Sequence, residues 1–138
     1  MGKIELHNII SNLHHIRYTG GVDDLSIAEA EKTLQLKFAT EYIEYLKEFG
    51  QIEAQGIELT GLSDKCSTSV INATNSLRKV ASIPEDLYVI EDLGIDGIEY
   101  LQDVQGKIYQ YSGRSQISMY ADSLVEYINK SQNNNKDV

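Results

Sequence analysis

The sequence predicts an α+β fold in which helices pack against a mixed or antiparallel sheet. Apolar residues recur at helical spacing through most of the first half, and they alternate with polar residues in short runs after residue 84. These two periods are typical of helices followed by half-buried strands. A chain of 138 residues is long enough for one domain with a real core and short for two. We therefore expect a single domain over residues 1–130 and a disordered polar tail over residues 131–138.

Two helices are expected before residue 37. The first is predicted to run to about Tyr18, before Gly20-Gly21, on the strength of an apolar stripe formed by Leu6, Ile9, Ile10, Leu13 and Ile16. Ser26 and Glu29 then have the spacing of a capping box, in which each side chain satisfies a backbone N–H of the first helical turn. We therefore expect the second helix over residues 27–36, with Ile27, Ala30 and Leu34 facing inward.

A third helix is predicted between Thr40, a plausible N-terminal cap, and Gly50, which suits a left-handed C-terminal cap. Its buried stripe is expected to consist of Ile43, Leu46 and Phe49. Its outer side is expected to carry Glu44, Tyr45 and Glu48.

The apolar period changes to that of a strand over residues 52–62 and returns to that of a helix between Val70 and Pro84. Three short β-rich runs follow at residues 87–90, 98–104 and 107–111. They are divided by Asp96-Gly97 and Gln105-Gly106, dipeptides that favour tight hairpin turns. The sequence therefore predicts an antiparallel meander. Asp122 is expected to cap a last helix whose apolar side contains Leu124, Val125 and Ile128.

Composition narrows the classes of function. The formal net charge of −9 disfavours binding to nucleic acids and to anionic membranes. No apolar run has the length of a membrane span, and the first five residues lack a signal-peptide core. One cysteine, Cys66, cannot form an internal disulfide. We therefore expect a cytoplasmic protein that needs no cofactor.

Acidic residues are concentrated between Val80 and Gly106, where the chain has no Lys, Arg or His. Carboxylates grouped on strands and turns could dock against a cationic protein surface. Tyrosine is favoured at contact hot spots, and three tyrosines fall on the predicted meander. The predicted partner-binding residues are Glu91, Asp92, Asp96, Glu99, Tyr100, Asp103, Tyr109 and Tyr111. The alternative is a solvated acidic face that keeps the protein soluble.

Metal binding and catalysis have weaker support in the sequence. Residues 92–97 with Asp103 have some features of a calcium loop, but a glycine occupies the third ligand position and the closing ligand is Asp. His7, His14 and His15 lack partners at zinc-site spacing. Cys66 lacks a base at any known family spacing, and no hydrolase or phosphate-loop motif is present. We therefore predict neither a metal site nor an enzyme.

Several segments, taken in order, resemble the SUKH (Smi/Knr-like) superfamily. IAEAEKTL at residues 27–34 and EYIEYLKEFG at residues 41–50 are similar to the paired helices that open those domains. GIEYL at residues 97–101, GKIYQY at 106–111 and ADSLVEYI at 121–128 are similar to their later strands and closing helix. The family's Leu-Pro before the acidic-Tyr pair is replaced here by Lys37-Phe38-Ala39-Thr40. The resemblance covers about residues 25–129.

The resemblance implies a SUKH-like α+β fold and, as in many bacterial members, a role as an immunity protein. Such a protein would bind and neutralise a cognate toxin, often a nuclease, encoded as the C-terminal domain of a neighbouring gene product. The acidic surface predicted above would then occlude the active cleft of that toxin. Other members of the family serve as regulatory or scaffolding domains, which gives the alternative function.

Overall fold

The computed structural model describes residues 2–94, 97–113 and 116–136, and within them it contains five helices and two antiparallel sheets. The helices are α1 (Gly2–Ser11), α2 (Asp24–Leu34), α3 (Thr40–Glu48), α4 (Val70–Val80) and α5 (Leu124–Lys136). The strands are β1 (Arg17–Tyr18), β2 (Ile52–Ala54), β3 (Ile57–Glu58), β4 (Tyr88–Asp92), β5 (Glu99–Gln102), β6 (Ile108–Tyr111) and β7 (Ile117–Ala121). The predicted α+β class is confirmed.

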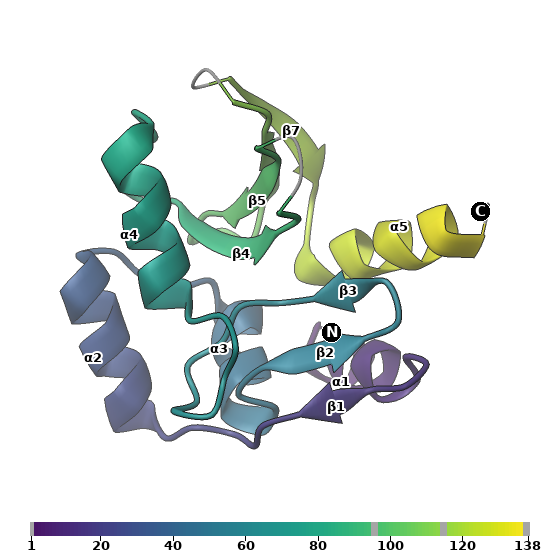
Figure 1. Ribbon diagram of the computed structural model, residues 1–138. Coiled ribbons are helices and arrows are strands. Elements are labelled where there is room, and N and C mark those ends of the chain that lie inside the picture. Colours follow the sequence, from purple (N-terminus) through teal and green to yellow (C-terminus); the bar gives the residue numbers. More distant parts are fainter. Residues whose placement is uncertain (1, 95–96, 114–115, 137–138) are drawn as a thin grey trace.

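The two sheets lie one above the other in Figure 1, joined by helices at both sides. The lower sheet has the order β1-β2-β3, and the upper sheet is the meander β4-β5-β6-β7. Helix α4 covers one face of the meander, while α5 packs against α1 and lies beside β3 and β7. The predicted meander is confirmed for β4 to β6, and β7 is a further strand that the sequence did not indicate.

The main core joins the two ends of the chain. Leu6 and Ile10 of α1, Leu46 of α3 and Ile128 of α5 are all buried in one cluster. A smaller cluster lies under α4 and contains Leu77, Leu87, Val89, Leu101 and Tyr111. The fold therefore rests on two separate apolar cores on opposite faces of the meander.

Buried tyrosines of α3 meet at Thr60, which is itself fully buried. The Tyr42 hydroxyl lies 2.8 Å from Thr60 Oγ1, which donates to the carbonyl of Val89 at 2.8 Å. The Tyr45 hydroxyl donates to the Thr60 carbonyl at 2.8 Å. The prediction that Tyr45 lies on the outer side of its helix is therefore wrong, because these polar tips find partners inside the core. Ile43, predicted to be buried, is only half-buried.

A second buried polar chain connects α3 with β4, β5 and α5. The Tyr88 hydroxyl accepts from the N–H of Ala39 at 2.9 Å and donates to Gln102 at 2.8 Å. Gln102 Nε2 donates to Glu41 Oε1 at 2.8 Å, and the N–H of Leu124 donates to the same oxygen at 2.7 Å. Glu41 thus supplies a carboxylate to the N-terminal end of α5, where the helix dipole favours negative charge.

The first helix is shorter than predicted. Helix α1 ends at Ser11, and residues 17 and 18 instead pair with β2, Arg17 opposite Glu53 and Tyr18 opposite Ile52. Leu13 remains buried, so the apolar stripe correctly marks an inward face. Its spacing could not show that the chain reverses at His15, whose φ is 60°.

The capping residues of α2 differ from the prediction. Asp23 caps α2 by accepting the N–H of Ser26 at 2.9 Å, so the proposed Ser26–Glu29 capping box is wrong. Gln35 adopts a left-handed conformation with φ of 57°, which ends the helix at Leu34.

The entries of α3 and α5 also differ by one residue from the prediction. Helix α3 begins at Thr40 after Ala39, which makes no side-chain cap, so Thr40 is not the capping residue. Ser123 Oγ accepts the N–H of Glu126 at 3.1 Å, so Ser123 rather than Asp122 caps α5. Gly50 has φ of 77°, as its predicted left-handed position requires.

Two further segments differ from their predicted patterns. Residues 52–62 form two short strands that turn at Gly56, whose φ is 83°, rather than one strand. Helix α5 extends to Lys136, so the segment predicted as a polar tail begins inside this helix.

Candidate functional site

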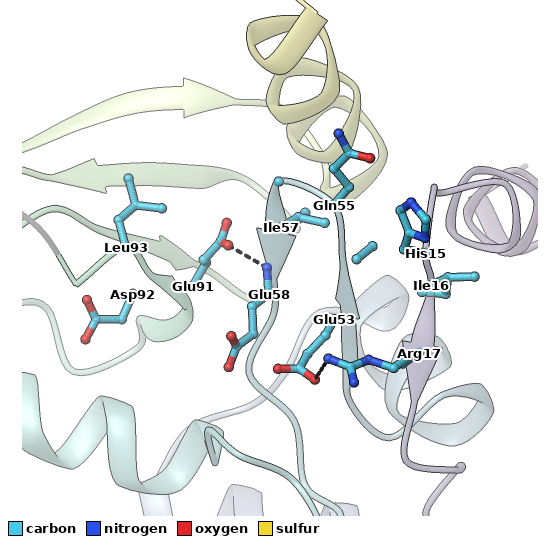
Figure 2. Close-up of a pocket in the computed structure, with 12 residues that line it drawn as sticks. His15, Ile16, Arg17, Glu53, Gln55, Ile57, Glu58, Glu91, Asp92 and Leu93 are labelled. Carbon is cyan, nitrogen blue, oxygen red and sulfur yellow. Dashed lines mark hydrogen bonds and ion pairs between the residues drawn. The ribbon is translucent and has the colours of Figure 1, made fainter. Parts of the chain in front are cut away.

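A groove of about 870 Å³ separates the two sheets on one side of the molecule. Its walls come from β1, the β2–β3 hairpin and the end of β4 (Figure 2). Four acidic residues, Glu53, Glu58, Glu91 and Asp92, line it together with Arg17. We call this feature the acidic groove. It is made by residues that lie far apart in the sequence.

Glu91 sits at the bottom of the acidic groove and is only 5% exposed. Its Oε2 accepts the N–H of Glu58 at 2.8 Å (Figure 2). Its Oε1 accepts the hydroxyl hydrogen of Tyr127. Burial raises the pKa of the Glu91 carboxyl, although both hydrogen bonds oppose that rise. Glu91 therefore joins β4 to β3 and to α5. It does not present its charge on the surface, contrary to the prediction.

Glu58 and Glu53 carry the exposed charge of the lower wall. Glu58 Oε2 accepts hydroxyl hydrogen bonds from Ser67 at 2.8 Å and from Thr68 at 3.2 Å. These two hydroxyls hold the carboxylate in one orientation. Glu53 pairs with Arg17 at 3.1 Å, and the Arg17 side chain is 78% exposed. The Glu58 carboxylate is thus held in place by hydroxyl groups, and among the described residues it has no cationic partner.

Asp92 lines the upper wall of the acidic groove, and Glu99 stands opposite it on the neighbouring strand β5. Asp92 is exposed and accepts the N–H of Gly94 at 2.8 Å. Glu99 is half-buried, and burial together with the charge of Asp92 raises its pKa to about 7. Both residues line a second hollow of about 390 Å³ beside α4, whereas only Asp92 of the two lines the acidic groove. Asp92 therefore belongs to both hollows and connects them.

Asp103 and Tyr109 lie at the opposite end of β5 from Glu99. The Tyr109 hydroxyl donates to Asp103 Oδ2 at 3.0 Å, and Asp103 Oδ1 accepts the N–H groups of Gln105 and Lys107, each at 3.0 Å. These bonds close the turn before β6. The predicted acidic run therefore does not form one surface, because its members occupy both ends and the interior of the meander.

The predicted contact tyrosines are mostly packing residues. The ring of Tyr100 packs in tilted geometry against Tyr120 and Tyr127, with centroids 4.7 and 4.9 Å away. Burial raises the pKa of Tyr100 to about 12. Tyr111 is 7% exposed and belongs to the small core under α4. Tyr111 is therefore not a surface contact, contrary to the prediction. Asp96 lies outside the described residues.

Sequence reasoning missed Glu53 and Glu58. Both occupy the β2–β3 hairpin, where they stand opposite each other in the register. The strand period showed correctly that the Glu58 side chain is exposed. No local signal in the sequence showed that this hairpin lies next to the end of β4, because that placement depends on tertiary packing.

The residues considered for metal binding or nucleophilic chemistry are dispersed. His7 pairs with Glu48, and Asp103 lies at the far end of β5 from Asp92. Burial raises the pKa of the Cys66 thiol, which makes it a poorer nucleophile. Within the described ranges, no group of three or more His, Cys, Asp or Glu residues is arranged to hold a metal ion. The helices of those ranges are also too short or too polar to span a membrane.

The family model SUKH_5, described as SMI1-KNR4 cell-wall, matches residues 6–133. A search of curated proteins found no match. The match covers all five helices except the first residues of α1 and the last of α5. SUKH domains are generally non-catalytic, and the family commonly acts as immunity proteins against polymorphic toxins. The resemblance found in the sequence is thereby confirmed, and the chain belongs to the SUKH family.

Proposed function

We propose that this protein is an immunity protein that binds a cognate protein toxin with a basic contact surface through the acidic groove. The observation that carries the proposal is the convergence of Glu58 and Asp92 from separate sheets on one groove. Family membership supports the same role, because immunity against toxins is common among SUKH proteins.

Electrostatics explains how such a groove would find its partner. The chain carries a net charge of −9, so it attracts a cationic protein over distances comparable with the Debye length, about 8 Å at physiological salt. Nucleases bind phosphates with clusters of Lys and Arg, and carboxylates on a protein surface can form ion pairs with the same side chains. A toxin with a cationic nuclease cleft therefore fits this surface best.

The proposed inhibition is stoichiometric. Binding would cover the active cleft of the toxin and exclude its substrate, so it requires no covalent step. The half-buried apolar side chains of Ile16 and Ala54 in the groove would add contact area, while the carboxylates would set orientation and the rate of encounter. Long-range charge then governs the on-rate, and fit in the groove governs the off-rate.

The test is co-expression with the toxin-like C-terminal domain of the neighbouring gene product. Glu58→Lys and Asp92→Lys are each expected to lower the association rate by about tenfold at low salt and to flatten its salt dependence. Glu85→Lys is the matched control, since Glu85 is exposed outside the groove. Thermal unfolding should change little in all three variants.

Rescue of cells by wild type, with weaker rescue by the two groove variants, supports the proposal. Equal binding by wild type, both groove variants and the control would contradict the role of the groove. Absence of rescue together with stable binding to another cellular protein would favour the regulatory or scaffolding alternative.

A further inference from the structure

The second hollow, beside α4, combines an apolar wall with a charged end. Ala73, Leu77 and Val80 of α4 form the apolar side, and Asp92 and Glu99 form the charged end. Val80 is 81% exposed, while Leu77, three residues earlier in α4, is buried. Such a shape accommodates a long side chain that is apolar along its stem and charged at its tip.

The charged end of this hollow consists of two carboxylates on neighbouring strands. Asp92 and Glu99 are opposite each other in the antiparallel register, a position in which like charges are destabilising. Among the described residues, no Lys, Arg or His forms an ion pair with either of them. The loop before α4 and the facing turn of α4 present polar uncharged groups to the hollow, those of Ser67, Thr68, Ser69, Asn72 and Ser76.

We propose that this hollow receives one lysine or arginine side chain of the protein partner, with the stem along α4 and the charged head between Asp92 and Glu99. The inference rests on the proposed function, because it names the partner's contacting chemistry. Asp92 lines both this hollow and the acidic groove, so a single partner surface can occupy the two together. Charge complementarity selects a cationic side chain over a neutral one of equal length.

Binding of a cation in this hollow should change the protonation of Glu99. Asp92 on β4 is the titratable group that faces Glu99 across the strand pair, and Tyr111 on β6 stands opposite Glu99 on its other side. Because the pKa of Glu99 is raised to about 7, the carboxyl is partly protonated at neutral pH. A bound cation favours the ionised form. Binding near pH 7 should therefore release protons from the complex.

The direct test uses N-acetyl-arginine N-methylamide as a probe and the corresponding citrulline amide as its neutral, equally long control. The probe is added to the full-length protein labelled with ¹⁵N. We expect the arginine probe to shift the amide resonances of Ala73, Leu77 and Glu99, and the citrulline amide to leave them unchanged. Glu99→Gln should weaken the arginine effect about three- to fivefold, and Glu85→Gln should not.

Equal shifts from both amides, or shifts spread over exposed acidic residues elsewhere, would overturn the inference. So would full toxin affinity in Glu99→Gln. These failures are distinguishable from failure of the proposed function. Toxin binding that depends on Glu58 but not on Glu99 removes only the inference. Arginine-selective binding in this hollow without rescue from any neighbouring toxin removes only the immunity role.

With a toxin in hand, calorimetry in buffers of different ionisation enthalpy measures the protons released. Wild type should release more protons near pH 7 than Glu99→Gln does, by up to about half a proton per complex. Equal release by the two proteins would count against the placement of the cation next to Glu99.

Discussion

The hydroxyl of Tyr127 donates a hydrogen bond to the carboxylate of Glu91, and the other oxygen of that carboxylate accepts the N–H of Glu58. Helix α5 and the two sheets therefore meet at a single buried acid. A buried charge is costly without hydrogen-bond partners, so Glu91 must keep both of these contacts. Because the contacts hold β3 and α5 against β4, they also fix the position of the acidic groove.

Tyr127→Phe tests the junction by removing one of its two hydrogen bonds. We expect the free energy of unfolding to fall by about 1–3 kcal/mol, because the Glu91 oxygen then remains buried without a donor. Urea denaturation measures this change in the free energy of unfolding. Tyr100→Phe is the control, since Tyr100 belongs to the same aromatic cluster but the hydrogen bond of its hydroxyl to Gln110 is long, at 3.4 Å. A loss no larger than that of the control would show that Glu91 does not depend on α5.

Glu91→Gln should change how stability depends on pH. Burial raises the pKa of Glu91 in the folded state above 4.5, its value in the absence of the fold. The proton is therefore bound more tightly in the folded state, so the resulting stability is present below pH 4.5 and is lost as the pH rises through the folded pKa. Glu91→Gln should lack this loss.

Chemical denaturation between pH 4 and pH 8 checks this expectation. Relative to the Gln variant, wild type should be more stable at the acidic end of the series than at the basic end. Parallel curves for the two proteins would mean that the pKa of Glu91 is the same in the folded and unfolded states. Glu85→Gln, at an exposed position, provides the control.

Gly50→Ala tests the close approach of two chain segments at the end of α3. Gly50 has φ of 77°, and an added Cβ would lie 2.0 Å from the carbonyl oxygen of Gly20. We expect the free energy of unfolding to fall by about 3 kcal/mol or more, because the backbone at Gly20 or Gly50 must move to make room for the added Cβ. Gly94→Ala is the matched control, with φ of 72° and open space around the added Cβ. The free energy of unfolding of Gly94→Ala should fall by about 1–2 kcal/mol, which is the cost of placing a non-glycine residue in the left-handed conformation.

Local signals were sufficient to predict much of the fold. The apolar period located α4 and the meander, and Gly106, with φ of 97°, lies at the predicted turn. Errors arose where two local patterns competed. Asp23, rather than Ser26, caps α2, and both residue types have the required oxygen. Strand β7 could not be predicted because apolar and polar residues alternate only weakly along it. It forms a strand by pairing with β6, which is a tertiary contact.

The candidate site was harder to predict because it depends on tertiary packing. Asp92 and Glu99 were identified from the density of acidic residues, and the register places them together. Their neighbour Glu91 has the same chemistry, yet strand alternation directs it inward to Tyr127. Glu58 comes from a hairpin more than thirty positions earlier in the chain, as its bond to Glu91 shows. Charge counting along the sequence could not distinguish these cases.

The shared core of α1 and α5 bears on how the chain folds. Leu6 and Ile10 pack in one cluster with Leu124 and Ile128, which lie more than one hundred positions further along the chain. Bringing such distant segments together costs loop-closure entropy before their contacts stabilise the fold. We therefore expect the main core to close after the local helices and hairpins have formed.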